Sequence, residues 1–99
     1  MDLQKWYNLT VTQQLGNIGS EINRARGFEK KNDKEARDRC ILRALELVDL
    51  TLTDPKWHNR LSELTCFQEV VYDWFKETHI YQITPEELEN YCIAFSLRG

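Results

Sequence analysis

Four acidic side chains are spaced so that they could hold a divalent cation between two helices. Glu46 and Asp49 are three residues apart, and Glu69 and Asp73 are four residues apart, so each pair lies on one face of a predicted helix. Carboxylates presented in this way from neighbouring helices can bind magnesium and act on nucleotide phosphates. The four acids therefore leave a magnesium-dependent nucleotide hydrolase as one open function.

This spacing departs from the pattern of the all-α nucleotide pyrophosphohydrolases, which is ExxE followed by ExxD. Here the first pair ends in aspartate, the second pair is one residue wider, and no basic phosphate-binding residues lie close by. We therefore expect solvated or ion-paired acids, and predict no metal site and no cofactor. A further possibility is that Arg39 or Arg43 points inward and pairs with Glu69 or Asp73, which would set the register of two helices.

Cysteine and histidine residues form neither a reactive nor a zinc-binding pattern. Cys40, Cys66 and Cys92 are far apart, each lies among apolar residues, and there is no C-x-x-C or H-x-x-x-H sequence. His58 and His79 stand alone in segments of loop-like composition. We expect three reduced core thiols in a cytoplasmic protein and assign no catalytic residue, which favours a binding role over an enzyme.

The net charge of −3 conceals a basic segment. Residues 24–43 contain eight basic and four acidic side chains, a charge of +4, whereas residues 44–99 contain four basic and ten acidic ones, a charge of −6. Clustered Lys and Arg could contact the phosphates of a nucleic acid, although a pI near 5.4 opposes general affinity for such a polyanion. The candidate phosphate-binding residues are Arg24, Arg26, Lys30, Lys31 and Lys34.

Small residues recur along one side of the first long predicted helix. Each glycine inside a helix costs about 1 kcal/mol relative to alanine, so we expect a neighbouring helix to approach closely there, within the chain or in a homodimer. Eleven aromatic residues are also many for a core of this size, which predicts an apolar interface. The candidate interface residues are Gly16, Gly19, Ser20, Asn23, Trp6 and Tyr7.

Hydrophobic spacing and capping residues predict two helices in the first half of the chain. The first begins after Thr10, which forms a capping box with Gln13, and stops at Gly27. The second starts at Asn32 or Asp33 and ends at residues 54–55, because the residue before proline is disfavoured in a helix. The short connection between them favours an antiparallel hairpin.

Two further helices are predicted in the second half. The third opens within residues 54–59 and runs to Phe75, and residues 76–83 form a loop. The fourth begins after Thr84, which is a capping residue, with Pro85 in the first helical position, and its buried side extends to Leu97. One domain over residues 1–99 with an all-α, up-and-down antiparallel four-helix bundle accommodates these elements.

Composition supports an ordered protein outside the membrane. Apolar residues make up 41% of the chain and charged residues 29%, and no apolar run approaches the about 20 residues that span a bilayer. The first residues also lack the basic and apolar regions of a signal peptide. We therefore expect a cytoplasmic protein.

Several sequence runs resemble a family of small uncharacterised prokaryotic helical proteins. The runs are residues 17–25 (NIGSEINRA), residues 43–51 (RALELVDLT), Arg60-Leu61-x-x-Leu64 and residues 69–75 (EVVYDWF). More loosely, the length and four-helix pattern are similar to those of HEPN domains. That likeness implies a partner of minimal nucleotidyltransferases or a component of toxin–antitoxin systems.

HEPN ribonucleases carry an arginine, then four to six other residues, then a histidine, and neither His58 nor His79 has an arginine at that spacing. The resemblance therefore implies a non-catalytic, partner-binding version. Taken together, the residues predict a small interaction module that self-associates as a homodimer and binds a partner protein. A nucleic-acid-binding adaptor and a magnesium-dependent nucleotide hydrolase remain the alternatives.

Overall fold

The computed structural model describes the backbone of residues 2–98 and the side chains of residues 2–93. Within that range the chain is helical and contains no strand, which confirms the predicted all-α class. The elements are α1 (Leu3–Tyr7), α2 (Val11–Lys30), α3 (Lys34–Leu52), a 3₁₀ helix η1 (Pro55–Arg60), α4 (Leu61–Lys76) and α5 (Pro85–Arg98). None of the helices described has the length and apolar character needed to cross a membrane.

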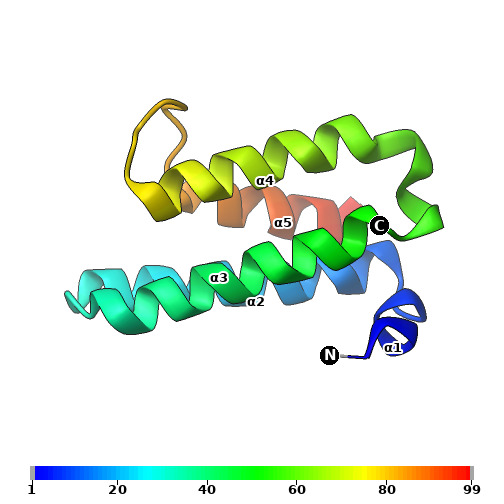
Figure 1. Cartoon of the computed structure of the whole chain (residues 1–99), viewed down its shortest axis with the longest axis horizontal. Helices are drawn as coiled ribbons and strands as arrows, with labels where there is room; N and C mark the ends of the chain where they lie inside the picture. The colour runs from blue at the N-terminus through cyan, green and yellow to red at the C-terminus, as the bar shows by residue number, and fades with distance from the viewer. Residues whose placement is uncertain (1, 99) are drawn as a thin grey trace.

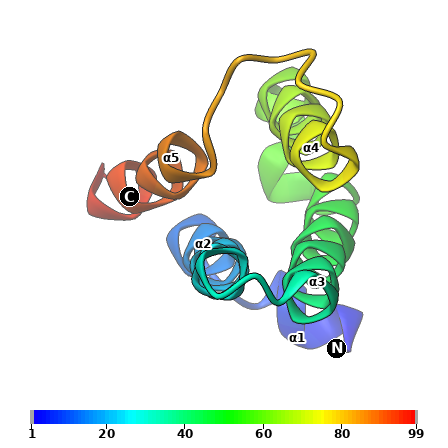
Figure 2. The ribbon, with the colours of Figure 1, turned by 90° about the vertical axis from the view of Figure 1, so that its left-hand side faces the viewer.

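The four longer helices pack side by side in the order α4, α3, α2 and α5. α2 and α3 form a hairpin, α4 lies along α3, and α5 lies along α2 (Figure 1). Seen end-on, the loop over residues 77–84 crosses from α4 to α5 on the side away from the α2–α3 hairpin (Figure 2). α1 lies at the opposite end of the molecule from this loop, beside the start of α2.

The start of α2 follows the sequence prediction and its end does not. Thr10 and Gln13 form the predicted capping box. The helix continues through Gly27 to Lys30, so the predicted stop at Gly27 is wrong. Gly27 has a helical backbone, and its conformational freedom alone does not end a helix whose flanking residues pack on the core.

The turn that ends α2 depends on Asn32 instead. Asn32 adopts a left-handed conformation, with φ of 59°, and its amide donates to the carbonyl of Glu29 over 3.1 Å. The amide of Asp33 donates to the carbonyl of Phe28 over 2.9 Å, which completes a Schellman motif. The Asp33 side chain then accepts a hydrogen bond from the amide of Ala36 and caps α3.

The connection from α3 to α4 contains an element that the sequence did not separate. The Asp54 side chain accepts from the amide of Lys56, and a 3₁₀ helix follows over Pro55–Arg60. Arg60, with φ of −130°, breaks this segment from α4, so the predicted third helix consists of two helical pieces. The predicted start of the last helix is confirmed, because Thr84 accepts from the amide of Glu87 over 3.1 Å.

Most predicted apolar stripes form the core. Leu15, Ile18 and Ile22 from α2 are almost fully buried, as are several members of the predicted α3 and α4 stripes, namely Ile41, Ala44, Val48, Leu64 and Val71. Leu61 is an exception at 39% exposure. Phe95 and Leu97, predicted on the buried side of the last helix, lie outside the side chains described.

A buried polar network joins α1, α2 and η1. Gln14 is completely buried, accepts a hydrogen bond from the Trp57 indole over 2.8 Å, and donates to the Trp6 carbonyl and to the Asp54 carboxylate. The Trp6 indole donates to the hydroxyl of Thr51 over 3.0 Å. Trp6 and Trp57 therefore lie inside the molecule at 0% and 1% exposure, and the prediction that Trp6 belongs to an interface is wrong.

The small-residue strip brings α5 close to α2 within one chain. Gly19 is buried, and a Cβ atom added there would lie 2.9 Å from the Cβ atom of Cys92 on α5. The close approach that the glycines predicted thus occurs between two helices of the same molecule. Gly27, eight residues later, has nothing within 4 Å of the corresponding position.

These two glycines predict opposite effects of the same substitution. We expect Gly27→Ala to raise the free energy of unfolding by about 1 kcal/mol, because alanine is the better helix former and meets open space. We expect Gly19→Ala to lower it by about 1 kcal/mol, because overpacking against Cys92 exceeds the propensity gain. Urea denaturation of both variants measures the difference, and a shift of equal sign in both would contradict this account.

Candidate functional site

A groove of about 630 Å³ lies between α3, α4 and the loop that follows α4. Its apolar wall consists of Leu45 from α3, Tyr72 from α4, and Ile80 and Tyr81 from the loop. Tyr72 is 50% exposed and Ile80 is 75% exposed, so this wall faces solvent. A concave surface of this size that exposes large apolar side chains is typical of a site that binds another molecule.

Asp73 holds the loop in place to form the groove. The carboxylate, which is 8% exposed, accepts hydrogen bonds from the Thr78 hydroxyl and from the amides of Ile80 and Tyr81, at 2.9 and 3.1 Å. The helix itself ends at Lys76, and the next residue, Glu77, has a φ of 57°, which places it in the left-handed region. The sequence suggested a metal ligand or an ion-pair partner at Asp73, whereas the structure gives it a loop-fixing role.

The other two carboxylates in the groove are also bound by the protein. Glu69 accepts a hydrogen bond from the hydroxyl of Tyr81 over 2.7 Å, which fastens the far side of the loop to α4. Asp49 accepts from the side-chain amide of Gln68 and so links α3 to α4. Each carboxylate thus contributes to the shape of the groove.

The charge state of the groove follows from these bonds. The hydrogen bond from Thr78, supported by the amides of Ile80 and Tyr81, lowers the pKa of Asp73 below its ordinary value despite the opposing effect of desolvation. The Tyr81 hydroxyl donates a hydrogen bond to Glu69, and this bond raises the pKa of the Tyr81 phenol. At neutral pH Asp73 is therefore ionised and the Tyr81 phenol is neutral.

The four acids considered for magnesium do not come together. Glu46 lines a separate groove between α2 and α3, whereas Asp49, Glu69 and Asp73 line the α3–α4 groove with the hydrogen bonds described above. Among the residues described there is no group of three or more metal-binding side chains placed to hold an ion.

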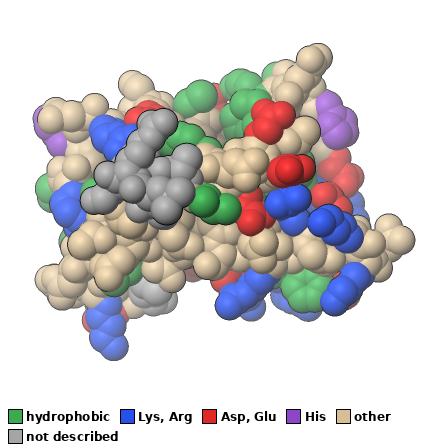
Figure 3. Space-filling view, turned by 180° about the vertical axis from the view of Figure 1, so that it is seen from behind, with side chains coloured by type: hydrophobic (Ala, Val, Ile, Leu, Met, Phe, Trp, Pro, Cys, Tyr) green, Lys and Arg blue, Asp and Glu red, His purple; other side chains and the backbone are tan. Residues whose placement is uncertain are grey.

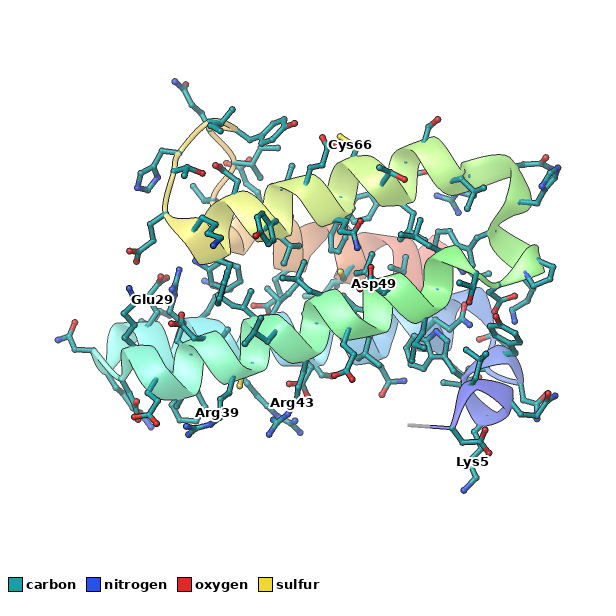
Figure 4. The ribbon with its side chains drawn as sticks, viewed as in Figure 1. Lys5, Glu29, Arg39, Arg43, Asp49 and Cys66 are labelled. Carbon is teal, nitrogen blue, oxygen red and sulfur yellow. The ribbon has the colours of Figure 1, made fainter. Side chains whose placement is uncertain are left out.

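Neither of the two arginines considered from the sequence, Arg39 and Arg43, points inward. Arg39 and Arg43 point away from α4 (Figure 4) and are 59% and 57% exposed, so the proposed pairing with Glu69 or Asp73 is wrong. Arg43 instead lies 3.7 Å from Glu21 on α2. Their positions on the outer face of α3 explain this, since α4 packs on the opposite side.

Arg37 is the arginine that the helix packing buries, at 2% exposure. It donates to Glu29 on α2 over 3.0 Å, to Asp38 over 2.8 Å and to the carbonyl of Trp74 at the end of α4 over 2.7 Å. Its guanidinium also lies over the Trp74 ring, 5.4 Å from the ring centre. No charge spacing in the sequence distinguished this arginine from its neighbours.

The five candidate phosphate-binding residues differ in whether a carboxylate lies within ion-pair distance of them. Arg26 is held by Glu89 of α5 at 2.6 Å, and Arg24 by Glu21 at 2.7 Å. Lys34 lies 3.7 Å from Glu77, while Lys30 and Lys31 are exposed. The rear surface shows Lys and Arg side chains toward the α2–α3 turn, with Asp and Glu side chains beside several of them (Figure 3).

The remaining candidate interface residues serve contacts within the chain. Asn23 donates to Glu89 of α5 over 3.0 Å, and the Ser20 hydroxyl donates to the carbonyl of Gly16 over 3.0 Å. Tyr7 is half-buried, and its hydroxyl contacts Thr53. The structure therefore uses much of this surface to join α2 to α5 and α1 to the end of α3.

The cysteines divide into two buried thiols and one exposed thiol. Cys40 and Cys92 are buried as predicted, and burial raises the pKa of Cys92 to about 12 and also raises that of Cys40. Both thiols are therefore unreactive at neutral pH. Cys66 is exposed, so the prediction of three core thiols is wrong for it, because it lies on the outer side of α4 beside the buried Phe67.

Comparison of the chain with models of protein families, with curated proteins and with solved structures gave no match. The resemblance to small prokaryotic helical proteins and to HEPN domains therefore stays a prediction. The features that define the candidate site are the exposed apolar wall of the α3–α4 groove and its three hydrogen-bonded carboxylates.

The Asp73 contacts predict a loop that is released by acid. Because the pKa of Asp73 in the folded protein is lowered, its stabilisation of the loop is present at neutral pH and is lost as the pH falls through that pKa. We expect Asp73→Asn to speed amide exchange of Ile80 and Tyr81 at neutral pH and to remove this acid dependence. Hydrogen exchange, corrected for intrinsic rates, tests this, with Asp49→Asn as the control. Unchanged protection of the loop amides in Asp73→Asn would disprove the assignment.

Proposed function

We propose that this protein is a non-catalytic interaction module of the cytoplasm, built as an up-and-down antiparallel four-helix bundle. Its contact surface is the α3–α4 groove, in place of the strip along α2. The observation that carries this proposal is the combination of an exposed apolar wall with carboxylates that already accept hydrogen bonds from the protein. Such carboxylates shape a binding surface, and they have less freedom to move protons or to bind a metal.

The magnesium-dependent hydrolase has less support than the interaction module. Glu46 is separated from the three other acids, and those three hold the loop and the α3–α4 pair together. A ligand that binds the folded state raises the melting temperature, and the rise grows with the logarithm of the ligand concentration once that exceeds the dissociation constant.

We therefore expect millimolar magnesium to leave the melting temperature unchanged. Differential scanning calorimetry with and without the ion measures this, with potassium chloride at matched ionic strength as the control. A rise in melting temperature that is lost in Glu69→Gln would instead restore the hydrolase as the leading function.

A nucleic-acid-binding adaptor also has less support, because several of its candidate cations already face carboxylates. Arg24 and Arg26 form ion pairs at 2.7 and 2.6 Å, and Lys34 lies within 4 Å of Glu77. Only Lys30 and Lys31 of the five have no such pair among the contacts described. Two exposed lysines supply little of the electrostatic attraction that phosphate binding requires.

The exposed apolar wall predicts that the groove binds a small neutral apolar probe. We expect Nile red fluorescence to rise when the dye is added to dilute protein, because the groove volume suits a ligand of that size. Tyr72→Ser should weaken dye binding by about tenfold, because it removes much of the apolar wall.

Ile93→Ser is the matched control, since Ile93 on α5 is 49% exposed and Tyr72 is 50% exposed. It should leave dye binding unchanged. Absence of binding to the dilute protein, or loss of binding only in Ile93→Ser, would contradict the assignment of the groove as the contact surface.

A further inference from the structure

Charged residues on α4 are arranged symmetrically about the exposed Tyr72. Glu69 precedes Tyr72 by three residues and Lys76 follows it by four, so all three lie on one face of the helix and all three line the groove. If a second α4 were laid antiparallel across Tyr72, Glu69 of each copy would face Lys76 of the other. An interface with two-fold symmetry requires such self-complementarity, in which residue i meets residue j and residue j meets residue i.

The apolar surface around the groove is complementary to itself as well. Ile80, which forms part of the groove wall, is 75% exposed and so can also pack against the apolar wall of a second copy. The hydrogen bond from the Ile80 amide to Asp73, one residue after Tyr72 in the helix, holds Ile80 beside the last turn of α4. Leu42, three residues before Leu45 on α3, is a further exposed apolar side chain, at 49%.

From these two observations we propose that the occupant of the α3–α4 groove is a second copy of this chain, bound with its α4 antiparallel to the first. The dimer is isologous, with Tyr72 at the two-fold axis and Ile80 of each copy against the groove of the other. This inference rests on the groove being the contact surface, and it specifies the partner.

Charge reversal tests the pairing directly. We expect sedimentation velocity across a concentration series to show a monomer–dimer equilibrium. Lys76→Glu should weaken the dimer by at least about tenfold, because Glu69 of each copy would then face a carboxylate of the other. The double variant Glu69→Gln with Lys76→Glu should recover part of the lost affinity, because it removes both repulsive pairs while the new amide oxygen can still accept the hydrogen bond from Tyr81. Circular dichroism confirms that each variant folds.

Two further variants distinguish this interface from others. Tyr72→Ser should weaken the dimer by at least about tenfold, while the equally exposed Ile93→Ser should leave it unchanged. A monomer at all concentrations would overturn the proposal, as would a dimer that only Ile93→Ser weakens. Equal weakening by Lys76→Glu and by the double variant would overturn the antiparallel pairing.

The Nile red experiment separates failure of this inference from failure of the proposed function. A groove that the second copy covers should bind the dye in dilute protein and lose it as the protein concentration rises. Dye binding that does not depend on protein concentration leaves the groove as a contact surface and overturns the second copy as its occupant. If the dye does not bind the dilute monomer, the proposed function itself is overturned, because the groove is then not a contact surface.

Discussion

The carboxamide of Gln14 has no exposed surface, and the interior can accommodate it only because its polar atoms are paired. Its oxygen accepts from the Trp57 indole, and its nitrogen donates to the Trp6 carbonyl and to Asp54. Burial by itself would raise the pKa of Asp54, but the hydrogen bonds from Lys56 and Gln14 lower it, so the carboxylate remains an acceptor. One amide thereby fixes α1, the start of α2 and η1 relative to one another. The direction in which α4 leaves this end of the molecule, and thus the position of the groove, depends on that arrangement.

A second buried acceptor determines the opposite end of α4. Asp73 lies where the helix stops, and its oxygen atoms take the place of the next turn by accepting amides from the loop. Arg37 adds a second donor at this helix end, because its guanidinium donates to the Trp74 carbonyl, which also accepts from the amide of Glu77. The groove is therefore bounded by groups that have little freedom to change position. A preformed surface of this kind loses little conformational entropy when it is covered, which favours association.

The charged residues show why the chemistry proposed from the sequence differs from that of the structure. Glu46, Asp49, Glu69 and Asp73 have spacings suited to a shared ion, but spacing along a helix specifies only which residues share a face. The rotation of α3 against α4 decides whether two such faces meet, and here it directs Glu46 toward α2. In the same way the packing turns Arg43 outward and buries Arg37 between three elements.

The sequence by itself determined the all-helical class, the caps at Thr10 and Thr84, and most of the buried stripes, because these depend on interactions within one or two helical turns. The sequence prediction was wrong about the end of α2 and about η1, which it joined to α4, because several residues in each segment could have formed the helix boundary. Only the tertiary structure decided that Gly19 meets a helix of its own chain, that Trp6 is buried, and that Asp73 fixes a loop. These outcomes depend on contacts between residues far apart in the chain, whose geometry is set by packing the whole core at once.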